Sequence, residues 1–225
     1  MLRDTPSLHP VLILAALLSL ISVLLTPGTL QADDRGWTLR LSAVYADPDL
    51  TFDTVGDDGQ RIRVEQDSAF GLALRAEYRL SPRWGVELGA MAVSNDLSIR
   101  VDNTGFGPLN LGPSVRMTPW TAGLLLHLTP QKRVDFYVAA RAAYVIYDDV
   151  VLEDALLGRE RQNADDDLGW SLGLGLDVPV GEGPWAAHFE IAHLDTVLEL
   201  TAPDGFETRL APEPLLIHAG VSYRF

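Results

Sequence analysis

The last eleven residues, 215–225, alternate between apolar and polar or small side chains and end the chain on Phe225. Every second residue counted back from Phe225 to Leu215 is apolar, and only Leu216 breaks the pattern. Alternation with a period of two places the two sets of side chains on opposite faces of a β-strand. An apolar face that ends on a terminal aromatic residue is typical of the closing strand of an outer-membrane β-barrel.

The same period of two recurs from residue 33 onward, and no segment in that region has a convincing helical period. The pattern therefore predicts a chain built of strands alone. We expect eight strands, at residues 37–46, 69–80, 84–93, 120–129, 134–147, 168–178, 185–193 and 215–225.

The connections between these segments alternate in length. The short ones contain Pro or Gly and predict tight turns at 81–83, 130–133 and 181–184. The long ones are polar and cover residues 47–68, 94–119, 148–167 and 194–213. Short turns at one end and long loops at the other are typical of membrane barrels. The predicted fold class is all-β, an eight-stranded antiparallel transmembrane β-barrel with short periplasmic turns and long outer loops.

The aromatic residues give an independent indication of where a membrane begins and ends. All five tryptophans lie near the ends of expected strands and on their apolar faces, at Trp37, Trp84, Trp120, Trp170 and Trp185. Amphipathic rings are expected where a barrel meets the lipid headgroups. A soluble β-sandwich is the main competing fold, but it gives no reason for this placement.

Charged and histidine side chains occupy the face opposite the apolar one. Because an unpaired charge in a dry interior is costly, we expect these side chains to pair with one another or to meet water. Small inward residues such as Gly173 and Gly175 either leave a narrow cavity or ease close packing of the sheet, and both interpretations fit equally. The predicted polar network of the lumen comprises Arg40, Arg75, Glu77, Glu87, His127, Arg141, Asp177, His188, Glu190 and His218.

The first 32 residues differ from the rest of the chain. Residues 11–25 form an apolar run interrupted only by two serines, with Arg3 before it and Pro27-Gly28 after it. The run is shorter than the roughly 20 residues that a membrane-spanning helix needs, which disfavours a retained anchor. We therefore predict a signal peptide at 1–32, cleaved after Ala32, and a single outer-membrane barrel at 33–225.

Composition excludes several classes of function. The formal net charge is −14, so we expect no binding to nucleic acid, because neutralising its phosphates requires basic groups. The chain has no cysteine, which excludes disulfides, thiolate chemistry and a lipoprotein anchor. Lys132 is the one lysine among seventeen basic residues. Arginine suits the phosphates of lipopolysaccharide, although a compositional bias explains the excess more simply.

Several segments resemble the OmpW family of small outer-membrane β-barrel proteins. The most specific match is the first expected hairpin, with Tyr-Arg-Leu-Ser at 78–81 followed by Trp-Gly-Val-Glu-Leu at 84–88. The opening segment, residues 136–144 and the last three strands are also similar, whereas 93–99 and 118–120 depart from the family pattern. The resemblance implies that the protein passes small, largely hydrophobic molecules across the outer membrane.

The expected partners follow from a barrel of this kind. They are outer-membrane lipids and lipopolysaccharide, small hydrophobic solutes, and the barrel-assembly machinery, which would bind a C-terminal signal containing Tyr223 and Phe225. We expect no cofactor. A hydrophobic solute would enter by apolar residues of the outer loops and leave sideways into the bilayer. The candidate entrance residues are Leu50, Phe52, Leu97, Phe106, Leu109 and Leu111.

Two other classes of function stay open. A sealed barrel that acts through its outer loops, in adhesion or membrane integrity, is compatible with the sequence. A lipid A-modifying enzyme is less so, because such an enzyme places a His two residues before a nucleophilic Ser. Here Asp195 follows His193 at that spacing, and a carboxylate cannot replace the serine. We therefore predict no enzyme activity and no catalytic residue.

Two groups of residues have the composition of a metal site. Three histidines, at 127, 188 and 218, are expected to face inward. They come from opposite sides of the predicted barrel, so ordinary interior hydrogen bonding is favoured. The acidic outer loops, for example Asp165-Asp166-Asp167, would suit Ca²⁺ bridging to lipopolysaccharide, but solvated loops are favoured there too. We predict no metal site.

Overall fold

The computed structural model describes residues 36–48, 51–55, 61–102, 109–130, 132–154, 158–201 and 207–225. The chain divides into residues 1–33 and 34–225, and the second unit holds every described residue. Among those residues, no helix is long and apolar enough to cross a membrane. The signal peptide expected at 1–32 lies outside the described residues and stays a prediction.

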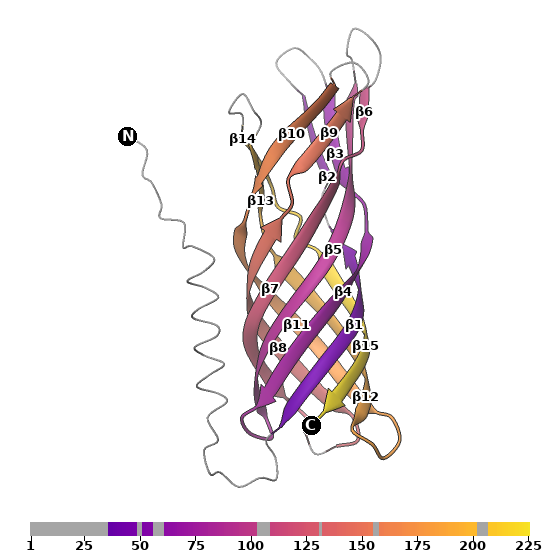
Figure 1. Ribbon diagram of the computed structural model, residues 1–225, viewed down its shortest axis with the longest axis vertical. Coiled ribbons are helices and arrows are strands. Elements are labelled where there is room, and N and C mark those ends of the chain that lie inside the picture. Colours follow the sequence, from indigo (N-terminus) through magenta and orange to yellow (C-terminus); the bar gives the residue numbers. More distant parts are fainter. Residues whose placement is uncertain are drawn as a thin grey trace, which may run out of the picture. The chain divides into compact units, whose positions relative to one another are not determined.

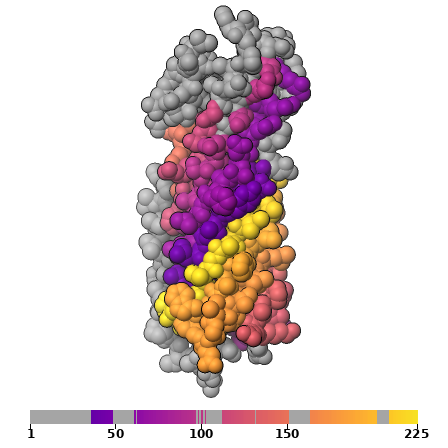
Figure 2. Space-filling view, turned by 90° about the vertical axis from the view of Figure 1, so that its right-hand side faces the viewer, coloured from indigo at the N-terminus to yellow at the C-terminus, as the bar shows by residue number. Residues whose placement is uncertain are grey.

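Eight antiparallel strands close into a barrel, and the predicted fold is confirmed (Figure 1). They pair in the order β1-β4-β5-β7-β8-β11-β12-β15, and β15 pairs with β1 to complete the circle. Figure 2 shows this closure, with the indigo of β1 beside the yellow of β15. The bounds are β1 (Trp37–Asp47), β4 (Ala69–Arg79), β5 (Trp84–Asp102), β7 (Ser114–His127), β8 (Asp135–Tyr147), β11 (Asp167–Pro179), β12 (Trp185–Asp195) and β15 (Leu215–Arg224).

Apolar side chains cover the outside of the barrel wall. Leu72 is 64% exposed and Leu174 is 66% exposed, although a soluble protein would bury residues of this kind. Aromatic rings meet one another at the end with the short turns, where Trp37 contacts Tyr78 at 5.1 Å between centroids and Tyr223 contacts Phe225 at 4.7 Å. An apolar belt edged by aromatic rings is the surface that a lipid bilayer requires.

The prediction that the long connections are loops was wrong for much of their length. β2 (Thr51–Val55), β3 (Arg61–Gln66) and β6 (Leu109–Leu111) extend the barrel sheet, while β9 (Val150–Asp154), β10 (Gly158–Asp165), β13 (Leu198–Thr201) and β14 (Glu207–Leu210) form a second sheet. In β3, Arg61, Arg63 and Glu65 are exposed and Val64 is buried. Because these exposed side chains are polar, the strands lack the apolar outer face by which the barrel strands were recognised.

The exposed apolar belt predicts a dependence on depth when a charge is placed on it. Leu174 lies in the middle of β11, and Leu168 lies at its outer end. We expect Leu174→Arg to reduce the free energy of folding into lipid vesicles, measured by urea titration, by about 2–4 kcal/mol. Leu168→Arg, the matched control, should cost about 0–1 kcal/mol. Equal costs for the two variants would contradict a membrane centred on the barrel wall.

Candidate functional site

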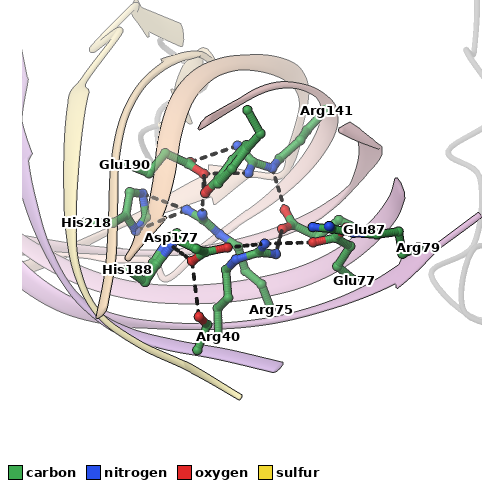
Figure 3. A network of polar contacts seen from close by, with 12 residues as sticks. Arg40, Arg75, Glu77, Arg79, Glu87, Arg141, Asp177, His188, Glu190 and His218 are labelled. Carbon is green, nitrogen blue, oxygen red and sulfur yellow. Dashed lines mark hydrogen bonds and ion pairs between the residues drawn. The ribbon is translucent and has the colours of Figure 1, made fainter. Parts of the chain in front are cut away.

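Arg40 lies at the centre of a buried network of charges inside the barrel (Figure 3). Its Nη2 donates to Glu77 Oε2 at 2.7 Å and to Asp177 Oδ2 at 2.8 Å. Its Nη1 donates to Glu87 Oε2 at 3.4 Å. The three carboxylates stand on β4, β11 and β5. One guanidinium on β1 therefore connects four strands across the lumen.

Glu190, on β12, gathers a second group of charges. Arg141 holds it with two parallel bonds, from Nη1 to Oε1 at 2.9 Å and from Nη2 to Oε2 at 2.8 Å. Arg75 Nη1 lies 2.8 Å from Glu190 Oε2, and the Tyr137 hydroxyl donates to the same oxygen at 2.8 Å. Arg141 Nε also donates to Glu87 Oε1 at 2.7 Å. Glu87 therefore joins the second group to the first.

A third group lies around His127, on β7. The His127 Nε2 atom is 2.8 Å from Glu77 Oε1, and its Nδ1 atom is 3.0 Å from Asp135 Oδ2. Arg79 Nη2 lies 2.9 Å from the same Nδ1 atom, so the donor and acceptor roles of the two ring nitrogens depend on the tautomer. Arg79 Nη2 donates to Asp135 Oδ2 at 2.9 Å. Because Glu77 also binds Arg40, the three groups form one connected network.

The structure places all ten predicted lumen residues in the interior, and none is more than 7% exposed. The three histidines do not come together, because His188 contacts Asp177 and His218 contacts Arg75, away from His127. Within the described part of the chain, no three His, Cys, Asp or Glu side chains are grouped to hold a metal ion. Asp135 and Tyr137 also belong to the interior, but they were not among the predicted lumen residues. Their position could have been predicted, because both alternate with the outward-facing Phe136.

The inward glycines make room for this network. A Cβ atom added to Gly175 would lie 2.2 Å from the Tyr137 ring carbon Cζ. One added to Gly173 would lie 3.1 Å from both Arg141 Nη1 and Glu190 Oε1. The space beside these two glycines is therefore filled by large side chains from neighbouring strands, which favours close packing over a channel at this level.

Toward the outer loops the interior becomes apolar. Leu194 and Leu216, which interrupt the pattern of their strands, face inward here and are at most 4% exposed. This apolar half of the lumen was missed because the inward face was expected to be polar throughout. The buried cluster includes Val44, Met91, Val93, Val115, Met117, Val145, Leu194, Leu198, Leu200 and Leu216.

A small cavity lies where the charged and apolar halves meet. Its volume is about 20 Å³, which is enough for roughly one water molecule. Arg75, Arg141 and His218 line its charged side, and Met91 and Pro119 are among the residues on its apolar side. Among the described residues, the side chains at this level therefore leave little open space along the barrel axis.

The barrel wall beside this cavity has an interruption. β5 and β7 pair continuously up to Ala90↔Trp120 and again from Val93↔Met117, but Met91 and Ala92, which pair with β4 on their other side, have no pairing with β7. Pro119 lies opposite Met91 and has no N–H to donate. The seven other strand pairings around the barrel are continuous within the described residues. We call the two unpaired positions and their partners on β7 the β5–β7 seam.

The predicted entrance residues lie partly outside the described residues. Leu50 and Phe106 belong to that part. The other four stand on strands at the outer end, namely Phe52 on β2, Leu97 on β5, and Leu109 and Leu111 on β6.

The His193 and Asp195 pair does not join the buried network. The His193 ring packs edge-on against Trp170, with centroids 5.8 Å apart, on the outward side of the wall. Thr196 faces inward, where its hydroxyl donates to Asp167 Oδ2 at 3.0 Å. The absence of enzyme activity stays a prediction.

The sequence matches the family described as outer membrane protein beta-barrel domain over residues 13–225. The chain belongs to that family. Its location is accordingly the bacterial outer membrane, and the short turns of this outer-membrane barrel face the periplasm. The resemblance to small barrels of the OmpW type is confirmed at the level of this barrel family. No curated protein sequence matches the chain.

Solved structures share the fold of this outer-membrane barrel. The crystal structure of OprG from Pseudomonas aeruginosa has a TM-score of 0.69 at 19% identity, covering 85% of this chain and 96% of that one. The solid-state NMR structure of AlkL in lipid bilayers has a TM-score of 0.54 at 16% identity, covering 88% and 94%. A major outer membrane protein from Thermus thermophilus has a TM-score of 0.50 at 15% identity, covering 84% and 99%.

The network predicts that loss of one buried charge destabilises the barrel. In Glu190→Gln the side chain keeps its shape, but Arg75 and Arg141 lose their shared carboxylate. We expect the free energy of unfolding, from urea titration in vesicles, to fall by about 3–5 kcal/mol. The control is Glu199→Gln, whose exposed partner Arg209 lies 3.6 Å away and which should cost about 0–1 kcal/mol. Similar losses in both variants would contradict the importance of the network.

Proposed function

We propose that this barrel passes small hydrophobic or amphipathic molecules across the outer membrane by a sideways route. The solute enters the apolar half of the lumen from the outer loops. It then leaves through the β5–β7 seam into the lipid. The observation that carries the proposal is the position of this seam, at the level where the lumen changes from apolar to charged.

The environment inside the barrel favours this direction. Apolar surface gains about 25 cal/mol per Å² when it leaves water, so the apolar half of the lumen attracts a hydrophobic solute. Further travel along the axis requires the separation of buried ion pairs such as Arg40 with Glu77, which costs several kcal/mol. The lipid outside the seam is the favourable exit.

The seam must open for a solute to pass, because the adjoining cavity holds only about 20 Å³. The missing pairs at Met91 and Ala92 leave fewer hydrogen bonds to break there than at a continuous ladder. The unbranched Met91 side chain, which lines the cavity, can change shape readily. The resemblance to the OmpW family supports the same proposal.

A sealed barrel that acts through its outer loops is the second candidate. The connected charges of Arg40, Glu87 and Glu190 favour it, because among the described residues they link strands across the lumen. The two candidates differ in what they require of the seam. Transport needs it to open, whereas a sealed barrel does not.

Closing the seam tests the proposal. Pro119→Val restores a backbone N–H, which can complete the ladder and lower the population of the open wall. One added hydrogen bond of about 1 kcal/mol reduces that population about fivefold. We therefore expect a comparable fall in the initial uptake of a fluorescent hydrophobic probe by lipopolysaccharide-bearing cells, at matched surface levels. Pro184→Ala, in a periplasmic turn, is the control and should leave uptake unchanged. Unchanged uptake with Pro119→Val would favour the sealed barrel.

The outer entrance is tested separately. Replacement of Phe106, Leu109 and Leu111 by Ser removes three apolar side chains from the predicted entrance. We expect slower uptake of the same probe at matched surface levels, because a polar entrance attracts a hydrophobic solute less. Native uptake by this variant would exclude these residues as the entrance.

A further inference from the structure

We propose that a pocket at the periplasmic end of the barrel binds the headgroup of an anionic phospholipid. The pocket lies between the connection from β4 to β5 and the connection from β7 to β8. Its volume is about 550 Å³, within the range of small-molecule binding sites. Its lining includes Ser81, Arg83, Trp84, Leu128, Pro130 and Lys132. We call it the turn pocket.

Hydrogen bonds anchor the first connection to the end of β7 and order the second connection internally, so the turn pocket is formed in advance of binding. The His127 N–H donates to the Arg83 carbonyl at 2.7 Å and ties the end of β7 to the first connection. Within the second, the Lys132 N–H donates to the Thr129 carbonyl at 3.1 Å, and the Thr129 hydroxyl donates to the Val134 carbonyl at 2.8 Å. A preformed site loses less entropy when a ligand binds.

The charge at the turn pocket opposes that of the chain. The protein carries a net charge of −14, yet residues 80–84 and 128–134 contain three basic groups and no acidic one. Among the described residues, neither Arg83 nor Lys132 has a carboxylate within ion-pair distance. Exposed arginines at the other end do have such partners, as Arg100 has in Asp102 at 3.0 Å. The pocket therefore presents positive charge that a ligand can neutralise.

The apolar part of the lining identifies the ligand as a lipid. Trp84 is 49% exposed and Leu128 is 54% exposed, and both belong to the apolar outer surface of the wall. Acyl chains can lie against these two side chains while the phosphate reaches Arg83 and Lys132. Arginine suits phosphate oxygens, and basic groups beside a membrane attract anionic lipid. At the periplasmic leaflet such a lipid is an anionic phospholipid, for example phosphatidylglycerol.

Trp84 provides the readout for a test. The full chain retaining Trp84 alone, with the other four tryptophans changed to Phe, is folded into phosphatidylcholine vesicles. Quenching of its fluorescence by brominated phosphatidylglycerol is compared with quenching by brominated phosphatidylcholine. One basic group near an anionic lipid changes affinity about fivefold, so we expect a preference for phosphatidylglycerol of about fivefold or more.

Matched variants locate the preference. Lys132→Gln should lower it about fivefold. Arg133→Gln removes the same charge from the same connection, but Arg133 does not line the turn pocket, so the preference should persist. Equal quenching by the two lipids would overturn the proposal. So would an equal loss in both variants, because that result assigns the preference to general surface charge.

Two further measurements keep the test decisive. Native mass spectrometry of the protein with all its tryptophans should show phosphatidylglycerol retained, and Lys132→Gln should retain less of it. Equal retention would contradict the site even if the single-tryptophan protein folds poorly. Glycerol 3-phosphate, the soluble headgroup fragment, should leave the quenching unchanged. Displacement by it would assign the pocket to a soluble phosphate compound and overturn a lipid ligand.

Discussion

The ion pairing of Arg40, Arg141 and Glu190 with their neighbours is the interaction on which the barrel interior depends. Each of these side chains binds partners on other strands, so the network connects opposite sides of the wall. Each charge has given up water to enter the interior, which makes the partners necessary. Arg141 and Glu190 also fill the space beside Gly173, and Tyr137 fills the space beside Gly175, so these side chains narrow the lumen. Stability and the narrowness of the lumen at the described residues therefore have one physical cause.

The two halves of the barrel distribute apolar and polar side chains between inside and outside in opposite ways. Around the network the outer surface is apolar, with side chains such as Leu174 exposed, and the interior is charged. Toward the outer loops the interior is apolar, while exposed positions such as Arg63 and Glu65 are polar. Lipid outside the first half and water outside the second explain this reversal. A hydrophobic solute thus finds favourable surroundings in the outer half and, beyond the wall, in the lipid.

Alternation alone was enough to predict the eight barrel strands and the inward position of residues such as His127 and Glu190. It failed for strands such as β3 and β10, because an apolar outward face exists only where lipid covers it. The contact partners of Arg40 depend on the stagger between strands, which no single segment encodes. The seam at Pro119 and the turn pocket each combine segments far apart in the chain, so their parts were visible in the sequence but their juxtaposition was not.

The closure of the lumen by paired charges is most directly tested by ion conductance. The purified protein is inserted into a planar lipid bilayer, and the current is recorded under an applied voltage. Because the side chains lining the junction between the charged and apolar halves leave a cavity of only about 20 Å³, we predict insertion without a steady ionic current. A stable, reproducible current from the native protein would show an open aqueous path and contradict the closed lumen from which the sideways route was inferred.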